Sequence, residues 1–313
     1  MSGHHHLDPS AGDARVVWAV VANLGLTVAQ IIGGILSGSL ALIADAIHNL
    51  SDALALVIAF MALKIARQPA NEKMTFGYGR AEIVAALINY TTLIVIGLYL
   101  VYEAVLRFFN PEDVDGWLVV IIAVIALAVD LVTALLTYSL SKQSVNIRAA
   151  FLHNVADALG SIAVIIAGSL ILLYDWRLVD PLVTLMIAGY ILWQSFSEIV
   201  FVIHILMLGS PTNFNTKDVF DRMLSIKGVA DVHNLHLWKM QEHENALDAH
   251  VVIDTGQWKN ADEIKKEVKS MLSSSFKIRQ TTLEVECSFH ACEEPKAIGH
   301  NTIVRDNHYD HSH

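Results

Sequence analysis

Cysteine is almost absent from this chain, which has only Cys287 and Cys292 among its 313 residues. A framework of disulfides is therefore excluded, and a reducing cytosol is the simpler environment for the part that carries them. Charge is also scarce, because Asp, Glu, Lys and Arg make up 17% of the residues and the formal net charge is −10. Nucleic-acid binding needs a concentrated basic face, and the sequence shows none.

The first residues lack the pattern of a cleaved signal peptide. MSGHHHLDPSAGDAR has no cationic start that leads directly into a short apolar core and a small-residue cleavage site. We therefore expect the first apolar segment to stay in the protein as a membrane anchor. Residues 1–14 are expected to be flexible, and His4, His5 and His6 fit either part of a purification tag or a loose metal-gathering tail.

Apolar residues are what the chain has in excess. They make up 54% of it, and the mean hydropathy is +0.48, which is too high for an ordinary soluble protein. Six stretches are long enough to cross the roughly 30 Å of bilayer hydrocarbon. They lie at about 16–36, 40–66, 81–108, 116–140, 147–173 and 178–206. The sequence thus predicts an α-helical membrane protein with a six-transmembrane-helix bundle over residues 15–208, surrounded by the lipid bilayer.

Lysine and arginine are distributed unevenly over the flanks of these stretches. One set of flanks holds only Arg107 and Arg177. The other set holds Arg15, Lys64, Arg67, Lys73, Arg80, Lys142 and Arg148. By the positive-inside rule, we expect the N- and C-termini to lie in the cytoplasm. The compact loops and the missing presequence fit a bacterial inner membrane.

From about Ser210 the composition becomes that of a small soluble domain. Helical and strand patterns follow in the order α-β-β-α-β, which predicts a ferredoxin-like cytoplasmic α+β domain over residues 209–294. Asn260 and Glu263 have the spacing of a capping box at the start of its second helix. Residues 295–313 are polar and contain four histidines, so a disordered tail is expected there.

One four-residue pattern occurs twice inside the apolar stretches. His48 and Asp52 stand in the second stretch, and His153 and Asp157 stand in the fifth. A spacing of i, i+4 places both side chains on one helix face. An Asp at the centre of a membrane costs roughly 2.5–3.5 kcal/mol, which a bound cation would offset. Two imidazoles and two carboxylates suit tetrahedral Zn²⁺.

Two structural interpretations of this pattern stand beside the transport interpretation. The His and Asp side chains could simply hydrogen bond between helices, or they could form a closed structural zinc site. A permanent site favours thiolates, whereas imidazole and carboxylate ligands compete with protons near neutral pH. The ligand types therefore favour a site that releases its metal.

Asp45 and Asp130 are further acidic residues inside the apolar stretches. Asp45 stands two helical turns before Asp52, where it either extends an ion or proton path or bonds a neighbouring helix. Asp130 either hydrogen bonds to a ligand of the metal site or relays protons. A hydrogen bond to Thr133 or Asn89 is its structural alternative.

The soluble domain has its own group of metal-binding residue types. His233, His236, His250 and Glu286 come from three strands of one predicted sheet, which indicates a second zinc site. Ordinary surface histidines are the alternative. Cys287 and Cys292 could join the site, although their spacing is not the two-residue gap of common thiolate sites.

Several segments together resemble the cation diffusion facilitator family, of the zinc-transporting type, over about residues 15–293. Their order and placement carry the resemblance rather than any isolated motif. The segments are LIADAIHNLSDALAL, FGYGRAEI, NIRAAFLHNVADALGSIAVI, DPLVTLMIAGYIL, VHNLHLW and LDAHVVI.

The resemblance implies a function and a set of ligands. The transported metal would bind His48, Asp52, His153 and Asp157 and be exchanged for protons by a homodimer, with Zn²⁺ as the main substrate and Cd²⁺ or Co²⁺ as side substrates. A regulatory metal in the cytoplasmic domain would bind His233, His250 and Glu286 and tighten the dimer. An accessory site of some members is not expected, because Asn71, Met74 and Tyr78 occupy that stretch.

We therefore predict a divalent metal cation/proton antiporter that exports Zn²⁺ from the cytoplasm and is not an enzyme. One alternative is a membrane-embedded metalloenzyme, which would need an open coordination position and a nearby general base. The apparently complete quartet and the lack of an HExxH motif oppose it. The other alternative is a membrane metal sensor without flux.

Overall fold

The computed structural model describes residues 24–141, 145–241, 244–292 and 295–299. For residues 52, 56, 59, 136–141 and 145–154 within these ranges it describes the backbone alone. The chain divides into two compact units, of which the first holds Met1–Ile65 and Val84–Val200 and the second holds Ala66–Ile83 and Phe201–His313. Each unit is described separately below.

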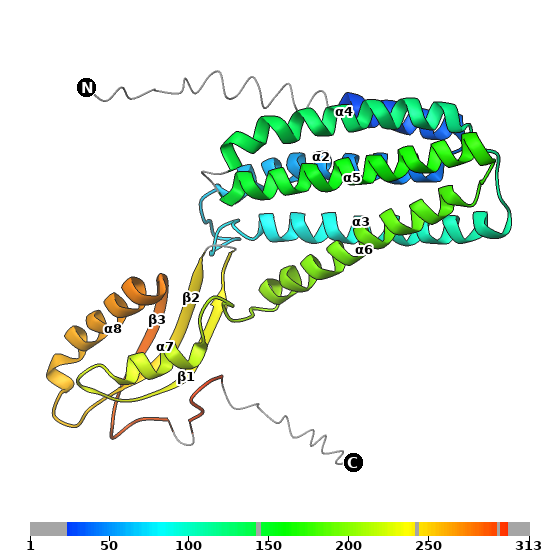
Figure 1. Cartoon of the computed structure of the whole chain (residues 1–313). Coiled ribbons are helices and arrows are strands. Elements are labelled where there is room, and N and C mark those ends of the chain that lie inside the picture. The colour runs from blue at the N-terminus through cyan, green and yellow to red at the C-terminus, as the bar shows by residue number, and fades with distance from the viewer. Residues whose placement is uncertain (1–23, 142–144, 242–243, 293–294, 300–313) are drawn as a thin grey trace, which may run out of the picture. The chain divides into compact units, whose positions relative to one another are not determined.

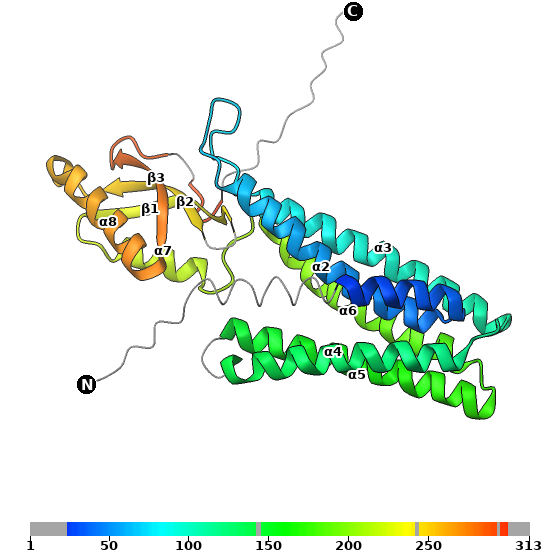
Figure 2. The ribbon, with the colours of Figure 1, turned by 90° about the horizontal axis from the view of Figure 1, so that it is seen from above.

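The first unit is a bundle of apolar helices (Figures 1 and 2). Five helices among the described residues are long and apolar enough to cross a membrane. They are α2 (Leu40–Ala66), α3 (Ala81–Phe109), α4 (Gly116–Ser141), α5 (Val145–Tyr174) and α6 (Val179–Leu206). A shorter apolar helix, Leu24–Ser37, precedes α2 and corresponds to the end of the first predicted span. The start of that span lies outside the described residues.

Helices α4 and α5 lie side by side in both views (Figures 1 and 2). Two glycines allow this close approach. A Cβ atom at Gly116 of α4 would lie 2.7 Å from the main-chain oxygen of Gly168 of α5, and one at Gly168 would lie 2.9 Å from Val120. Small residues at such points let membrane helices pack backbone to backbone. The two helices therefore form a tightly packed pair.

Asp180 in the first turn of α6 holds the first turn of α2. Its Oδ1 atom accepts a hydrogen bond from the Ser39 hydroxyl at 2.5 Å, and its Oδ2 atom accepts one from the Leu40 amide at 2.8 Å. The amide of Ala41 also donates to it, at 3.3 Å. The first amides of a helix have no partner within that helix and need an acceptor. Here the acceptor comes from a helix 140 residues further along the chain.

We expect Asp180→Ala to destabilise the helix bundle by about 1–3 kcal/mol, since it leaves buried donors without an acceptor. The amides of Leu40 and Ala41 would lose their partner. The guanidinium of Arg107 would lose the Asp180 carboxylate at 4.0 Å but keep its ion pairs with Glu103 and Glu112. Thermal unfolding of the purified protein in detergent measures the effect. Asp175→Asn is the matched control, because Asp175 forms an exposed ion pair in the adjacent loop. Equal melting temperatures for the two variants would contradict the prediction.

The second unit contains the small α+β domain that the sequence predicts. Its elements are α7 (Thr216–Leu224), β1 (Val229–Lys239), β2 (Asn245–Ile253), the 3-10 helix η1 (Trp258–Asn260), α8 (Ala261–Phe276) and β3 (Ile278–Cys287). The strand order is β1-β2-β3, with β1 and β2 antiparallel and β2 and β3 parallel. Helix α8 is therefore the crossover between the parallel strands (Figure 1). The predicted order α-β-β-α-β is confirmed.

One face of this sheet forms the core of the domain. Buried side chains of the strands, such as Val232, Leu247 and Val251, pack with residues of α7 and α8, such as Met223 and Leu272. Side chains alternate between the two faces of a strand. The residues between them therefore face away from the helices, and these residues include His250.

Two local predictions for this domain are wrong. Asn260 precedes α8, but it makes no side-chain capping hydrogen bond, and its amide nitrogen donates to Gln257 at 2.8 Å instead. The reason is that η1 runs directly into α8. The tail expected to be disordered from Pro295 begins with an ordered part, because Lys296 and Ala297 accept hydrogen bonds from β1. An edge strand offers unpaired backbone groups to such a segment.

Candidate metal sites

The structure brings together one member of each HxxxD pair. The Nε2 atom of His48 on α2 lies 3.4 Å from Oδ1 of Asp157 on α5, and the two side chains are 10% and 11% exposed. Helices α2 and α5 run in opposite directions (Figure 1). An antiparallel arrangement sets the first residue of one i, i+4 pair against the last residue of the other. The side chains of Asp52 and His153 lie outside the described part of the chain.

The imidazole of His48 also contacts an aromatic ring that the sequence analysis missed. Tyr190 of α6 meets it edge to face, with ring centroids 6.0 Å apart and planes at 85°. Tyr190 lies in the segment DPLVTLMIAGYIL, but an aromatic residue in an apolar helix gives no signal of its own. A third helix thus restricts the orientation of the imidazole.

Asp45 is buried and bonded to a neighbouring helix. It is 3% exposed, and its Oδ2 atom accepts a hydrogen bond from Gln30 Nε2 at 2.7 Å. The amide oxygen of Gln30 in turn accepts one from Asn49 at 3.2 Å. On its other side, a Cβ atom at Gly160 of α5 would lie 3.3 Å from Asp45 Oδ1. Gly160 therefore leaves the space in which this carboxylate approaches α5.

Asp130 of α4 uses a different partner from the two that the sequence suggested. Its Oδ2 atom accepts a hydrogen bond from the hydroxyl of Ser161 on α5, at 2.9 Å. The hydroxyl of Thr133 donates instead to the main-chain oxygens of Val129 and Asp130, at 3.1 and 2.9 Å. A threonine in a helix commonly bonds back to the preceding turn. Asp130 therefore links α4 to α5.

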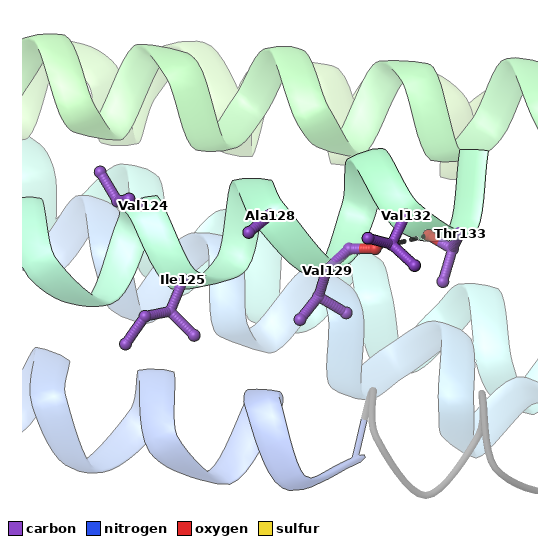
Figure 3. Close-up of a pocket in the computed structure, with 6 residues that line it drawn as sticks. All are labelled: Val124, Ile125, Ala128, Val129, Val132 and Thr133. Carbon is purple, nitrogen blue, oxygen red and sulfur yellow. Dashed lines mark hydrogen bonds between the residues drawn. The ribbon is translucent and has the colours of Figure 1, made fainter. Parts of the chain in front are cut away.

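The apolar depression on α4 shown in Figure 3 has no ionisable side chain among its lining residues. In Figure 3 the hydroxyl of Thr133 points back to its own helix. All the other lining side chains are aliphatic. The lining residues are Val124, Ile125, Ala128, Val129, Val132 and Thr133. This surface is suited to contact with lipid or another apolar helix rather than to ion binding.

Three of the four residues predicted for the second site meet on the sheet. His233 of β1 pairs with His250 of β2 in the ladder, and their ring centroids are 5.1 Å apart. Glu286 of β3 contacts both rings, with Oε2 3.3 Å from His233 Nε2 and Oε1 2.5 Å from His250 Nδ1. Two imidazoles and a carboxylate from three strands thus converge on the face opposite the core.

His236 does not join this cluster, which corrects the prediction for it. Its Nδ1 atom lies 3.3 Å from Oδ1 of Asp248, its partner in the ladder. A bulge between His233 and His236 puts both on the same face of the sheet. Their ladder partners on β2, His250 and Asp248, are two residues apart. Asp248 therefore contacts the ring of His236, which lies further along the sheet than the cluster.

Cys292 takes the fourth place in the cluster. Its Sγ atom lies 3.4 Å from Glu286 Oε1 and 3.6 Å from His250 Nδ1, and its amide donates to Glu286 Oε2 at 3.2 Å. Ligand atoms of His233, His250, Glu286 and Cys292 all lie within 4.8 Å of one another. Sequence spacing could not select Cys292 over Cys287, because the chain reaches the cluster through a turn after β3.

The charges in the cluster influence one another. Burial opposes ionisation of Glu286, but hydrogen bonds from His250 and Cys292 and the charge of His233 together hold its pKa below the usual value. Burial, a hydrogen bond to Glu286 and the negative charges of Glu286 and Glu284 raise the pKa of the Cys292 thiol. In the absence of a cation, the cluster therefore combines a carboxylate with a neutral thiol.

His233 provides an independent test of whether a metal fits. It is 1% exposed, and its Nε2 atom is buried without a hydrogen-bond partner among the described residues. A buried polar atom without a partner carries a free-energy cost. A cation bound there would remove that cost, and imidazole, carboxylate and thiolate are all zinc ligands. The residues present therefore fit a zinc ion.

Imidazoles thus meet carboxylates both among the apolar helices and on the sheet of the second unit. Ionisable side chains inside a membrane bundle mark ion pathways. Fold and site together define a multi-pass membrane protein that transports metal cations.

Comparison with known proteins gives the family. The model of the cation efflux transmembrane domain matches residues 16–207, and that of the cation efflux protein cytoplasmic domain matches residues 211–288. The chain therefore belongs to the cation efflux family, whose members are transporters and not enzymes. The resemblance noted from the sequence is confirmed.

Curated relatives match over nearly their whole length. The cadmium, cobalt and zinc/H(+)-K(+) antiporter of Bacillus subtilis is 35% identical over 92% of this chain and 93% of its own. The metal cation efflux system protein CzcD of Cupriavidus metallidurans is 33% identical over 96% and 94%. The zinc transporter ZitB of Pectobacterium atrosepticum is 32% identical over 98% and 99%. The chain is a metal cation efflux transporter.

Proposed function

We propose that this chain is a Zn²⁺/proton antiporter that exports the metal from the cytoplasm by alternating access. The contact between His48 Nε2 and Asp157 Oδ1, at 3.4 Å between two membrane helices, carries the proposal. Both groups bind a cation when deprotonated and release it when protonated. The names of the relatives support the metal and the exchange, since all but CzcD mention zinc and the first mentions H(+).

We infer that Asp52 and His153 complete the transport site. The antiparallel course of α2 and α5 sets His48 against Asp157. By the same geometry we expect Asp52 to meet His153 one turn along. Two imidazoles and two carboxylates match the ligands and coordination number of zinc. Cadmium and cobalt, which accept the same ligands, are secondary substrates.

Asp45 and Asp130 are proposed to carry protons between this site and the aqueous surface. Both carboxylates are buried, and each is hydrogen bonded to another helix, through Gln30 and Ser161. A carboxylate inside a membrane bundle has either a partner or a functional role, and proton relays are built from such residues. Their hydrogen bonds would hold them in place as they gain and lose a proton.

The cluster on the sheet is proposed to bind a regulatory zinc ion. His233, His250 and Glu286 would hold it. The buried Nε2 atom of His233 supports this, since it makes no hydrogen bond among the described residues and lies 3.3 Å from Oε2 of Glu286. A bound zinc supplies a fixed positive charge that joins side chains from three strands. We propose that this stiffens the surface through which two copies of the chain associate as a homodimer.

The arrangement in the membrane is also part of the proposal. Both termini would lie in the cytoplasm of a bacterium, with the bundle in the inner membrane, as the distribution of Lys and Arg indicates. The membrane domain would span residues 15–208 and the cytoplasmic domain residues 209–294. The ranges of the two family models support this division.

Zinc uptake by proteoliposomes tests the function directly. Vesicles with an acidic lumen are expected to take up zinc through the protein faster than vesicles without a pH gradient, and a protonophore should remove the difference. A membrane enzyme or a sensor would give no uptake in either case. If the rate of zinc uptake did not depend on the pH gradient, proton exchange would be refuted and the protein would be a zinc uniporter.

A further inference from the structure

The chain after β3 returns across the sheet to its opposite edge (Figure 1). Cys292 contacts Glu286 on β3 and His250 on the central strand. Further along, the amides of Asn234 and Leu235 on β1 donate to Lys296 and Ala297, at 2.8 and 3.2 Å. We call Cys292 together with Pro295–Gly299 the C-terminal strap. Its described parts contact the histidine cluster through Cys292 and strand β1 through Lys296 and Ala297.

The strap ends in an isolated bridge to β1. Leu235 and Ile298 form a parallel bridge, and the amide of Gly299 donates to the Leu235 oxygen at 3.0 Å. Strand β1 is an edge of the sheet, and the positive φ of 49° at Asn234 marks the bulge where the strap attaches. An edge strand readily accepts an added segment by backbone hydrogen bonding. Three hydrogen bonds alone make this a weak attachment.

A second connection between the strap and the sheet exists at the cluster. The Sγ atom of Cys292 is close to two of the other ligand atoms, and the buried Nε2 atom of His233 has no hydrogen-bond partner among the described residues. Four donors of the types that bind zinc in tetrahedral sites are thus within 4.8 Å of one another. Only Cys292 comes from outside the strands.

We propose that Cys292 is the fourth ligand of a metal site with His233, His250 and Glu286, so that the bound ion fastens the C-terminal strap to the sheet. The thiol loses its proton to solvent as the metal–sulfur bond forms. A thiolate ligand favours zinc, cadmium and cobalt over magnesium or manganese. The strap thereby makes the site selective for the class of ion that the proposed function assigns to the transporter.

This arrangement makes the order of the strap depend on the metal concentration. Without metal, hydrogen bonds to Glu286 hold Cys292, and backbone bonds to β1 hold the described residues of Pro295–Gly299. A metal–sulfur bond would anchor Cys292 more firmly a few residues before that segment, which lowers the entropic cost of keeping it on the edge. The bound state therefore covers the edge of β1 more completely.

Cobalt(II) spectroscopy of the full-length protein in detergent, kept reduced with a phosphine, tests the ligand assignment. A sulfur-to-cobalt charge-transfer band is expected in the wild type. Because the chain has only two cysteines and the membrane quartet has none, the band reports on the soluble domain. It should disappear in Cys292→Ser and persist in Cys287→Ser. No band in the wild type, a band that survives Cys292→Ser, or one that is lost in Cys287→Ser would overturn the proposal.

Amide hydrogen exchange tests whether the bound metal holds the C-terminal strap on β1. Zinc is expected to slow exchange at least several-fold in the peptides that contain Asn234, Leu235 and Gly299 in the wild type, and not in Cys292→Ser. Equal slowing in both proteins would show that metal does not act through the strap. The inference rests on the proposed function for the three strand ligands of the regulatory site and for the class of ion, and it does not depend on the transport site. His48→Ala, which should lack transport, is expected to keep both the cobalt band and the slowing, so the two proposals can fail separately.

Discussion

Replacing His48 by alanine is expected to reduce zinc uptake by proteoliposomes at least about 100-fold, since even the loss of an outer-shell partner of a metal ligand costs 10–100-fold. The variant removes one of the two groups that meet at 3.4 Å across α2 and α5. Asp157→Ala removes the other and should have a similar effect. Initial rates of uptake into vesicles with an acidic lumen measure both.

Two controls separate loss of the site from loss of the fold. Each variant should elute as the wild type does in size-exclusion chromatography, because alanine is tolerated in a helix. Asp175→Asn, in an exposed loop pair, should leave uptake unchanged. Full uptake by both His48→Ala and Asp157→Ala would refute the assignment of the site.

A conservative substitution at His48 tests the metal selectivity of the transport site. His48→Asp keeps a ligand but replaces a nitrogen donor by an oxygen donor, which suits harder cations such as manganese. The ratio of zinc to manganese uptake is therefore expected to fall, whereas in His48→Ala uptake of both ions is lost. A panel of divalent ions measured with the same vesicles gives this ratio.

The second large effect concerns zinc bound to the sheet. The experiment uses the His48→Ala variant, which lacks a ligand of the membrane site. Equilibrium dialysis is expected to find one zinc ion bound per chain, and adding His233→Ala should abolish this binding. At free zinc about 100-fold above the dissociation constant, binding stabilises the folded domain by about 2.7 kcal/mol. This increment should be missing in His233→Ala.

The ligand geometry supplies a matched control for this experiment. His236→Ala removes an imidazole from the same strand and the same face, but that ring pairs with Asp248 outside the cluster. It should keep both the zinc and the stabilisation. The zinc should be lost as the pH falls, because imidazole must be neutral to bind metal. Because its pKa is held below the usual value, the Glu286 carboxylate stays ionised to a lower pH than an ordinary glutamate does. Zinc retained by His233→Ala but lost by His236→Ala would reverse the assignment.

The sequence predicts the features that local periodicity encodes. The long apolar stretches correspond to α2 to α6, and the i, i+4 spacing of the HxxxD pairs led to the contact between His48 and Asp157. The pattern around His250 predicts strand β2, and the alternation of that strand puts His250 on the face opposite the core. In each case a short repeat determines which way a side chain points.

Features that depend on contacts between distant segments were not predictable in this way. Asp180 stands at the start of the sixth apolar stretch, where no local pattern indicates that a partner lies 140 residues earlier, at the start of α2. His236 shares the face of His233 because of a bulge that no residue pattern indicates, and it misses the cluster because its ladder partner is Asp248 rather than His250. Cys292 reaches the cluster through a turn whose direction only the folded sheet determines.

The opposed directions of α2 and α5 give the proposed transport site an approximate twofold axis in the plane of the membrane. An ion that arrives from either side would meet the same pair of ligand types, so the quartet itself has no preferred direction. The direction of transport must come from the gradients and from groups that break this symmetry. Asp45 is such a group, since it lies three residues before His48 whereas Ala150 lies three residues before His153. Reversing the pH gradient should therefore reverse zinc flux through the same ligands.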